Sequence, residues 1–155
     1  MSKFTNFLSA DFLPPETWKL TKPLVFMCEP IEHYVELMQI APKNITIHGD
    51  HTLEITTPVG YTSDLASVPK FLWWLIAPFD VARAAVIHDY LYDAIEAQSS
   101  CTPTLYKKRI RKAADDVFLL AMTASEPKIA NWKIKLCYTA VRIFGGFNIK
   151  GYNNV

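Results

Sequence analysis

Short apolar runs with strand composition, separated by prolines and turn residues, fill the first half of the chain. Two of these runs, 44–47 and 53–57, alternate apolar and polar positions. The sequence between them, His48-Gly49-Asp50-His51, is typical of a turn, so the pattern predicts a β-hairpin. Two earlier runs, 18–20 and 24–28, have the same strand composition.

The remaining segments of the first half give weaker signals. Residues 31–40 fit a short helix or a strand. Leu13-Pro14-Pro15 ends a segment without clear periodicity, because proline removes a backbone donor and restricts the residue before it. We therefore expect an N-terminal arm over 1–15 and a mainly β region over 16–60.

After Gly60 the apolar residues recur at the three-and-four spacing of amphipathic helices. The pattern predicts a short helix capped by Ser67, a helix from Asp80 to about Gln98, one opening at Thr102-Pro103, and one over 129–144 ended by Gly145-Gly146. The helical region then covers 67–146, and 147–155 form a tail. The predicted fold class is α+β: a small antiparallel hairpin or meander packed against three to four C-terminal helices, in a single domain over 1–155.

Composition indicates a globular protein with one core and points to no particular activity. The chain has 155 residues, half of them hydrophobic, which suffices for one core without a disulfide or metal. A net charge of +1 gives no broad field for nucleic acid, so no nucleic-acid partner is expected. The three cysteines are widely spaced and are expected to be buried apolar residues. The most apolar run, 71–79, is about half the length of a membrane span, and synthesis in a cytoplasm is expected.

One helix carries a histidine among apolar neighbours. His88 lies four residues after Ala84 and four before Tyr92, so it shares their face of the helix. A buried imidazole needs hydrogen-bond partners from elsewhere in the fold. Asp64, at the turn between the last strand and the helices, is a candidate partner, and it could equally cap the following turn. Tyr92 and Tyr90 are expected to be packing residues with one polar tip.

The third predicted helix adds Arg111 and Asp115, one turn apart, which favours a helix-spaced ion pair. Asp116 faces another direction and could meet Arg109 or Lys112. The candidate catalytic residues are one imidazole and three carboxylates: Asp64, His88, Asp89 and Asp115. Such groups suit a divalent zinc, manganese or magnesium ion, with His88, Asp89 and Asp115 as ligands, or general acid–base chemistry. The alternative is a hydrogen-bonded core histidine and ordinary caps and ion pairs.

Two neighbouring tryptophans, Trp73 and Trp74, point in different directions on a short helix. Both could pack in the core, or one could anchor a protein interface. His48 and His51 flank the hairpin turn, where exposed polar residues are ordinary.

The combined motif Gly60–Pro69, Leu72-Trp73, Ala85–Tyr92 and Ala114-Asp115 resembles a family carried by tailed bacteriophages and prophages. That family is catalogued as a domain of unknown function, and the likeness covers about 45–146. It implies a phage origin and a compact domain, and brings no established activity. Ala85-Val86-Ile87-His88-Asp89 is also similar to the central motif of the HD-domain phosphohydrolases, in which Asp115 or Asp116 would be the later ligand. His48 and His51 depart from that pattern because they lie in hairpin sequence.

Three functions remain open from the sequence. The first is a non-enzymatic component of the virion tail or tail tip, made in the host cytoplasm, whose partners are other phage structural proteins or further copies of itself. The second is a metal-dependent hydrolase of cell-wall or phosphate-ester bonds. The third is a host-directed binding protein that uses the surface of Trp73 and Trp74.

Overall fold

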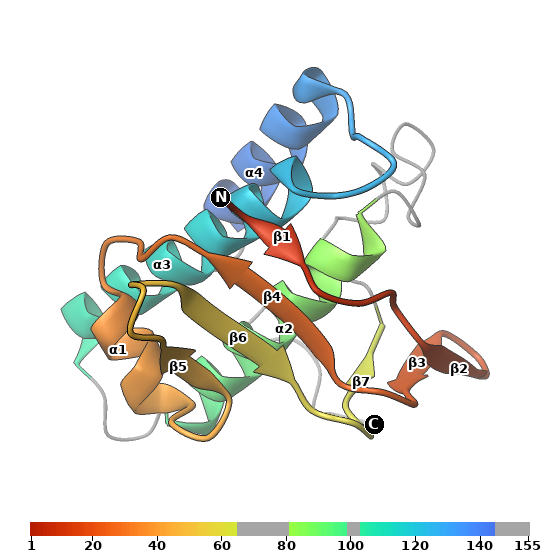
Figure 1. Cartoon of the computed structure of the whole chain (residues 1–155), viewed down its shortest axis with the longest axis horizontal. Helices are drawn as coiled ribbons and strands as arrows, with labels where there is room; N and C mark the ends of the chain where they lie inside the picture. Colours follow the sequence, from red (N-terminus) through yellow and green to blue (C-terminus); the bar gives the residue numbers. More distant parts are fainter. Residues whose placement is uncertain (65–80, 99–102, 145–155) are drawn as a thin grey trace.

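Two antiparallel sheets form the N-terminal half of the protein. The computed structural model describes residues 1–64, 81–98 and 103–144. The first sheet has the strand order β1 (Lys3–Phe4), β4 (Leu24–Cys28), β6 (Leu53–Thr57), β5 (Ile45–Ile47). The second sheet has the order β2 (Ala10–Leu13), β3 (Thr17–Leu20), β7 (Thr62–Ser63). Figure 1 shows the smaller sheet beside one end of the larger one.

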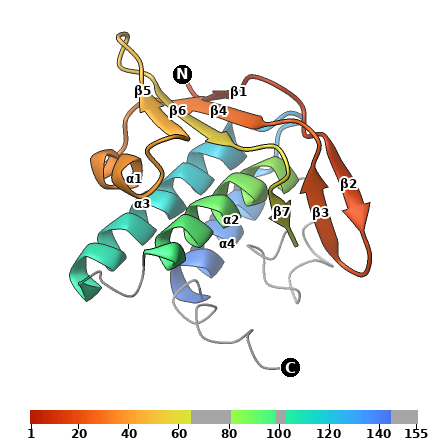
Figure 2. The ribbon, with the colours of Figure 1, turned by 90° about the horizontal axis from the view of Figure 1, so that it is seen from below.

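The described residues form four helices: α1 (Tyr34–Ile40), α2 (Ala82–Ala97), α3 (Thr104–Thr123) and α4 (Asn131–Phe144). Helices α2 and α3 run side by side beneath the four-stranded sheet, as Figure 2 shows. Helix α4 packs against α3, and α1 lies at the end of the sheet beside β5. The predicted α+β class is confirmed, with antiparallel sheets packed against four helices.

The predicted hairpin is present because its alternation matches the two faces of the sheet. β5 and β6 pair antiparallel, with Ile45 opposite Ile55 and Ile47 opposite Leu53. Leu53, Ile55 and Thr57 are buried while the residues between them are half-buried. The neighbouring strand β4 alternates in the same way, so both strands place one face against the helices.

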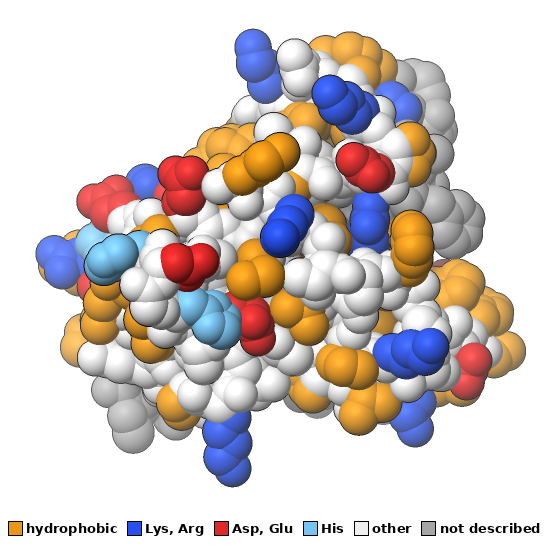
Figure 3. All heavy atoms as spheres, in the orientation of Figure 1, with side chains coloured by type: hydrophobic (Ala, Val, Ile, Leu, Met, Phe, Trp, Pro, Cys, Tyr) orange, Lys and Arg blue, Asp and Glu red, His pale blue; other side chains and the backbone are white. Residues whose placement is uncertain are grey.

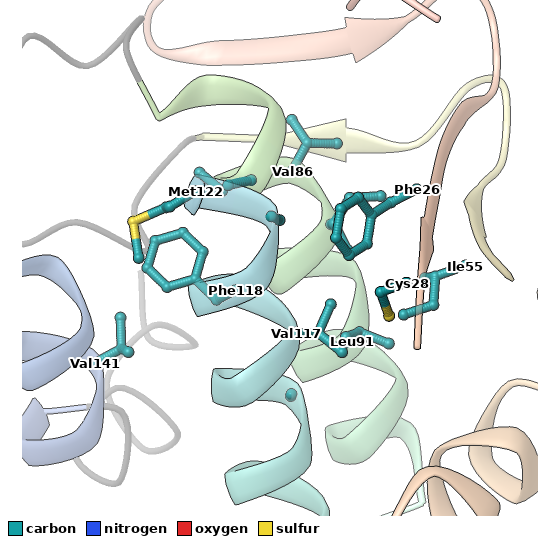
Figure 4. Close-up of a cluster of buried hydrophobic side chains, with 14 of the residues drawn as sticks. Phe26, Cys28, Ile55, Val86, Leu91, Val117, Phe118, Met122 and Val141 are labelled. Atoms are coloured by element: carbon teal, nitrogen blue, oxygen red, sulfur yellow. The ribbon is translucent and has the colours of Figure 1, made fainter. Parts of the chain in front are cut away.

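The core lies between this sheet face and the helices (Figure 4). Phe26 of β4 and Ile55 of β6 point toward Leu91 of α2. On the other side of α3, Phe118 faces Val141 of α4. All five side chains are at most 4% exposed, so a continuous apolar layer joins the sheet to the last helix.

The structure differs from several expectations in the first 40 residues. The arm over 1–15 contains two strands, β1 and β2, because they pair with β4 and β3 further along the chain. The ambiguous segment 31–40 forms helix α1 over Tyr34–Ile40. Strands of two to four residues show too little alternation to be predicted from sequence.

The helix starts also shift slightly. Helix α3 begins at Thr104 with Pro103 in the cap position, and α4 begins at Asn131 rather than 129. The position before α2 is Val81, which makes no side-chain cap. The predicted caps Ser67 and Asp80, the pair Trp73 and Trp74, and Gly145-Gly146 lie outside the described residues. None of the described helices is long and apolar enough to span a membrane.

Candidate functional site: a buried carboxylate network

The best-defined polar site lies between α2, α3 and α4. His88 sits on the face of α2 that packs against α3 and is 3% exposed, as its apolar neighbours predict. Asp115 sits on the facing side of α3 and is 1% exposed. An ionised carboxylate at such depth needs several hydrogen-bond donors to replace water.

Three donors surround the Asp115 carboxylate. Its Oδ1 accepts hydrogen bonds from His88 Nε2 at 2.8 Å and from the Tyr92 hydroxyl at 2.8 Å. Its Oδ2 accepts a hydrogen bond from Arg142 Nη1 at 2.7 Å. These four residues, His88, Tyr92, Asp115 and Arg142, are called the Asp115 network below. Three helices contribute to it, so it links α2, α3 and α4 in one arrangement.

Local helix geometry explains the pair of donors from α2. His88 and Tyr92 are four residues apart, so both project from one face of the helix toward Asp115. Their rings are 4.3 Å apart between centroids, and the Phe118 ring lies 4.8 Å from the imidazole. The imidazole therefore contacts two aromatic rings, which restrict its orientation.

The network keeps the Asp115 carboxylate ionised. Burial alone would raise its pKa, but the hydrogen bond and charge of His88, together with hydrogen bonds from Arg142 and Tyr92, outweigh burial and lower the pKa. The hydrogen bond to Asp115 also raises the pKa of Arg142. Burial, followed by the negative charge of Asp115, raises the pKa of the Tyr92 hydroxyl, so this group stays protonated. The result is an enclosed, ionised acceptor.

A second, more exposed link joins α3 to α4. Asp116 Oδ2 accepts from Lys112 Nζ at 2.7 Å, which confirms one of the two predicted pairings, and Asp116 Oδ1 accepts from the Tyr138 hydroxyl at 2.9 Å. The expected Arg111–Asp115 pair is wrong. Arg111 instead lies 3.6 Å from Glu96 of α2, because Asp115 turns inward toward its three donors.

A third polar group lies where β7 meets α2. Ser63 Oγ donates to Asp89 Oδ2 at 2.5 Å, and the Tyr61 hydroxyl donates to Asp93 Oδ2 at 2.7 Å. Burial raises the pKa of Tyr61, and the charges of Asp89, Asp93 and Asp64 raise it further. Three carboxylates therefore surround one phenol at this junction, and Asp64 is exposed there.

The predicted site residues thus fall into two groups. His88 and Asp115 come together in the interior, while Asp89 faces β7 and Asp64 lies near Tyr61. Within residues 1–64, 81–98 and 103–144, no group of three or more His, Cys, Asp and Glu side chains is arranged to hold a metal ion. His48 is paired with Glu54 at 2.9 Å beside the hairpin turn.

Sequence reasoning missed Arg142 and Tyr138. Both lie on α4 and meet consecutive acidic residues of α3. In an antiparallel pair of helices, residues at comparable distances from the connection face each other. That rule, applied to the consecutive acids of α3, is the one signal that could have pointed to the polar residues on α4.

The fold and network together define an α+β protein whose helices are joined through a buried carboxylate. A family model described as a protein of unknown function, DUF1353, matches residues 41–141. The chain therefore belongs to this family. The matched range includes His88, Tyr92 and Asp115, and ends one residue before Arg142. No curated protein and no solved structure matches the chain.

Proposed function

We propose that this protein is a non-catalytic component of a bacteriophage particle, in the tail or tail tip, and that the Asp115 network serves its structure. The observation that carries the non-catalytic part is the enclosure of Asp115 by its three donors and by the core. Both carboxylate oxygens are occupied by donors from the protein itself, and the side chain is 1% exposed. A general base or metal ligand has to reach a substrate, water or ion. Three hydrogen bonds occupy three of about four lone pairs of the Asp115 carboxylate, and its burial closes the remaining one to solvent.

The network favours a structural role for a second reason. It joins side chains from three helices, and a fully satisfied buried polar network disfavours alternative packings in which any member loses its partner. A subunit that has to match neighbouring subunits benefits from one fixed shape. Its partners would then be other phage structural proteins or further copies of the chain. The phage assignment itself rests on the sequence resemblance described above.

Mass spectrometry of purified particles tests this proposal. Particles from a phage or induced prophage that carries the gene would be purified by density gradient, and their peptides compared with those of the infected-cell lysate. We expect peptides of this chain to be enriched with the tail proteins. Detection in the lysate together with absence from the particles would overturn the proposal.

A metal-dependent hydrolase acting on cell-wall or phosphate-ester bonds is the second candidate. It is favoured by the acidic side chains of Asp64, Asp89 and Asp93 around Tyr61, which lie nearer the surface than Asp115. Oxygen ligands of this kind suit a hard divalent cation. In this reading Asp89 and Asp64 would supply two oxygen ligands and water molecules the others, because no three His, Cys, Asp or Glu side chains of the described residues are arranged to hold a metal ion. A bound water would be the nucleophile.

Metal analysis of protein purified without a histidine tag separates the two candidates. The hydrolase predicts bound divalent metal that is lost in Asp89→Asn, together with hydrolysis of peptidoglycan or of a phosphate-ester substrate. Asp50→Asn is the matched control, because Asp50 is exposed in the hairpin turn and is distant from Asp89 in sequence. A metal-free, inactive protein would remove this candidate and leave the first unaffected.

A further inference from the structure

The end of the chain carries only positive charge. After Glu126 the sequence contains five basic residues and no acidic one, namely Lys128, Lys133, Lys135, Arg142 and Lys150. The whole chain is almost neutral, with sixteen basic and fifteen acidic residues. The acidic groups are therefore concentrated before this point, and the α4 region has a local positive charge that the net charge conceals.

Helix α4 buries one apolar face and exposes two large apolar side chains on the opposite side. Ile134, Cys137 and Val141 are buried against the rest of the protein. On the opposite side, Trp132 is 51% exposed and Ile143 is 56% exposed. Their spacing of eleven residues returns the helix to nearly the same direction, so both lie on one outward stripe.

Two residues lie between them on this side of the helix. Leu136 lies four residues after Trp132 and seven before Ile143, and it is half-buried because it also packs against the core. The exposed Thr139 continues the same line. The outer stripe of α4, defined as Trp132, Leu136, Thr139 and Ile143, is about 16 Å long at a rise of about 1.5 Å per residue. Its two exposed large apolar side chains, Trp132 and Ile143, lie at its ends.

Lysines flank this stripe. Lys135 is exposed along one side of it, and Lys128 is exposed just before the helix begins. Neither forms an ion pair within the described part of the chain. At the top of Figure 3, over the start of α4, Lys and Arg side chains lie beside hydrophobic ones.

The acidic groups beneath α4 are already neutralised. Asp115 is bound to Arg142, and Asp116 is bound to Lys112 and to the Tyr138 hydroxyl. Glu126 is exposed just before Lys128 and is the nearest acidic residue in sequence. The exposed lysines at this face are therefore not cancelled by the carboxylates on α3.

We propose that the outer stripe of α4 and its lysines bind the surface of an anionic phospholipid bilayer. Tryptophan is favoured at the boundary between headgroups and acyl chains, and lysines beside an apolar strip reach anionic headgroups with their charged ends. A nucleic acid would use the lysines and leave the apolar stripe in water, so it explains fewer of the observations. The contact is peripheral, because no described helix is long and apolar enough to cross a bilayer.

The contacts of α4 with α3 keep this surface in a fixed helical form. Arg142 and Tyr138 hold α4 on α3 through Asp115 and Asp116, so the helix is formed before it meets a membrane. Binding therefore does not require the helix to fold at the bilayer, so it avoids the conformational entropy cost that unfolded peptides incur there. This inference goes beyond the virion assignment and does not depend on it.

Vesicle co-sedimentation tests the proposal with the full-length protein. The probes are vesicles of phosphatidylethanolamine with phosphatidylglycerol, and vesicles of phosphatidylcholine alone. We expect binding to the anionic vesicles that weakens as salt rises from about 50 to about 500 mM, and little binding to the zwitterionic ones. Equal binding to both vesicle types, or none to either, would overturn the proposal.

Substitutions locate the binding face. Each lysine near an anionic surface contributes about fivefold in affinity, so the double variant Lys128→Glu/Lys135→Glu should bind more than tenfold more weakly. Trp132→Ala should lower the affinity about tenfold through loss of the apolar contact. Circular dichroism of each variant checks that the exposed substitutions leave the fold intact.

Matched controls use exposed residues on other faces. Lys22→Glu/Lys43→Glu makes the same change in net charge, and Phe7→Ala removes another exposed aromatic ring. Both controls should bind anionic vesicles like the parent protein. An equal loss in both lysine pairs would show that net charge alone drives binding. Salt-sensitive binding of DNA without binding of vesicles would identify a nucleic-acid surface. Either outcome would refute the lipid assignment.

Discussion

Replacement of Asp115 by asparagine tests the network with the smallest change of shape. The amide oxygen can still accept from His88 and Tyr92, but the amide nitrogen then faces the Arg142 guanidinium, where two donors meet. The substitution removes one buried charge and one charge-assisted hydrogen bond. It leaves the volume of the side chain almost unchanged, so packing contributes little to the result.

The expected loss of stability follows from the burial of the partners. A hydrogen bond to a charged group contributes about 1.5–3 kcal/mol, and loss of one partner of a fully buried ion pair costs about 3–5 kcal/mol. The Arg142 side chain is 41% exposed, so it can turn toward water and recover part of this energy. We therefore expect Asp115→Asn to lower the free energy of unfolding by about 2–3 kcal/mol.

Urea denaturation followed by circular dichroism measures this change. With a slope of about 2 kcal/mol per molar urea, the midpoint should fall by about 1–1.5 M. Asp116→Asn is the matched control on the next residue of α3. The Asp116 side chain is 21% exposed and pairs near the surface, so its loss should stay below about 1 kcal/mol. Equal effects at both positions, or a change below about 0.5 kcal/mol at Asp115, would refute a dominant role for the buried network.

Three further predictions concern single groups. Because the folded-state pKa of Asp115 is lowered, its contribution to stability is complete above the unfolded pKa of about 3.9 and is lost as pH falls through the folded pKa. The difference in unfolding free energy between the parent and Asp115→Asn should accordingly shrink in acid, and a difference independent of pH would contradict this. Tyr92→Phe removes one hydrogen bond and should cost about 1 kcal/mol in the same urea assay, whereas an unchanged midpoint would show that the hydroxyl adds nothing. Burial raises the pKa of the Cys28 thiol to about 12 and that of Cys137 to about 11, so peptide mapping should find both unalkylated by iodoacetamide at pH 8 until the protein is unfolded. Rapid labelling of either in the native state would contradict their burial.

Much of the fold could be predicted where one face of an element is buried. The hairpin of β5 and β6 and the helices α2 to α4 show the periodicities of two and of three-to-four, because each packs one side against the core. Strands β1 and β2 could not be predicted. They are short and mostly exposed, and they exist through pairing with β4 and β3 rather than through their own sequence.

The sequence indicated the two buried residues of the candidate site, His88 and Asp115. His88 and Asp115 are polar residues on otherwise apolar helix faces, so each needed a buried partner, and they are that partner for each other. The prediction of an Arg111–Asp115 ion pair was wrong. Helical spacing shows which residues are close within one helix, but not which residues of other helices compete for them. A donor from α4, 27 residues away in sequence, takes that place, and only the pairing of α4 with α3 points to it.

The central claim is that Asp115 is held as a carboxylate by its three donors. The most direct test follows the carbon-13 NMR shift of the Asp115 carboxyl group as the pH is lowered. If three donors hold the carboxylate in its ionised form, the Asp115 resonance should stay in its deprotonated position down to a pH below about 3.9, the ordinary pKa of aspartate. A resonance that titrates at or above that value would show a carboxyl group without its three donors. The structural account of the network would then be wrong.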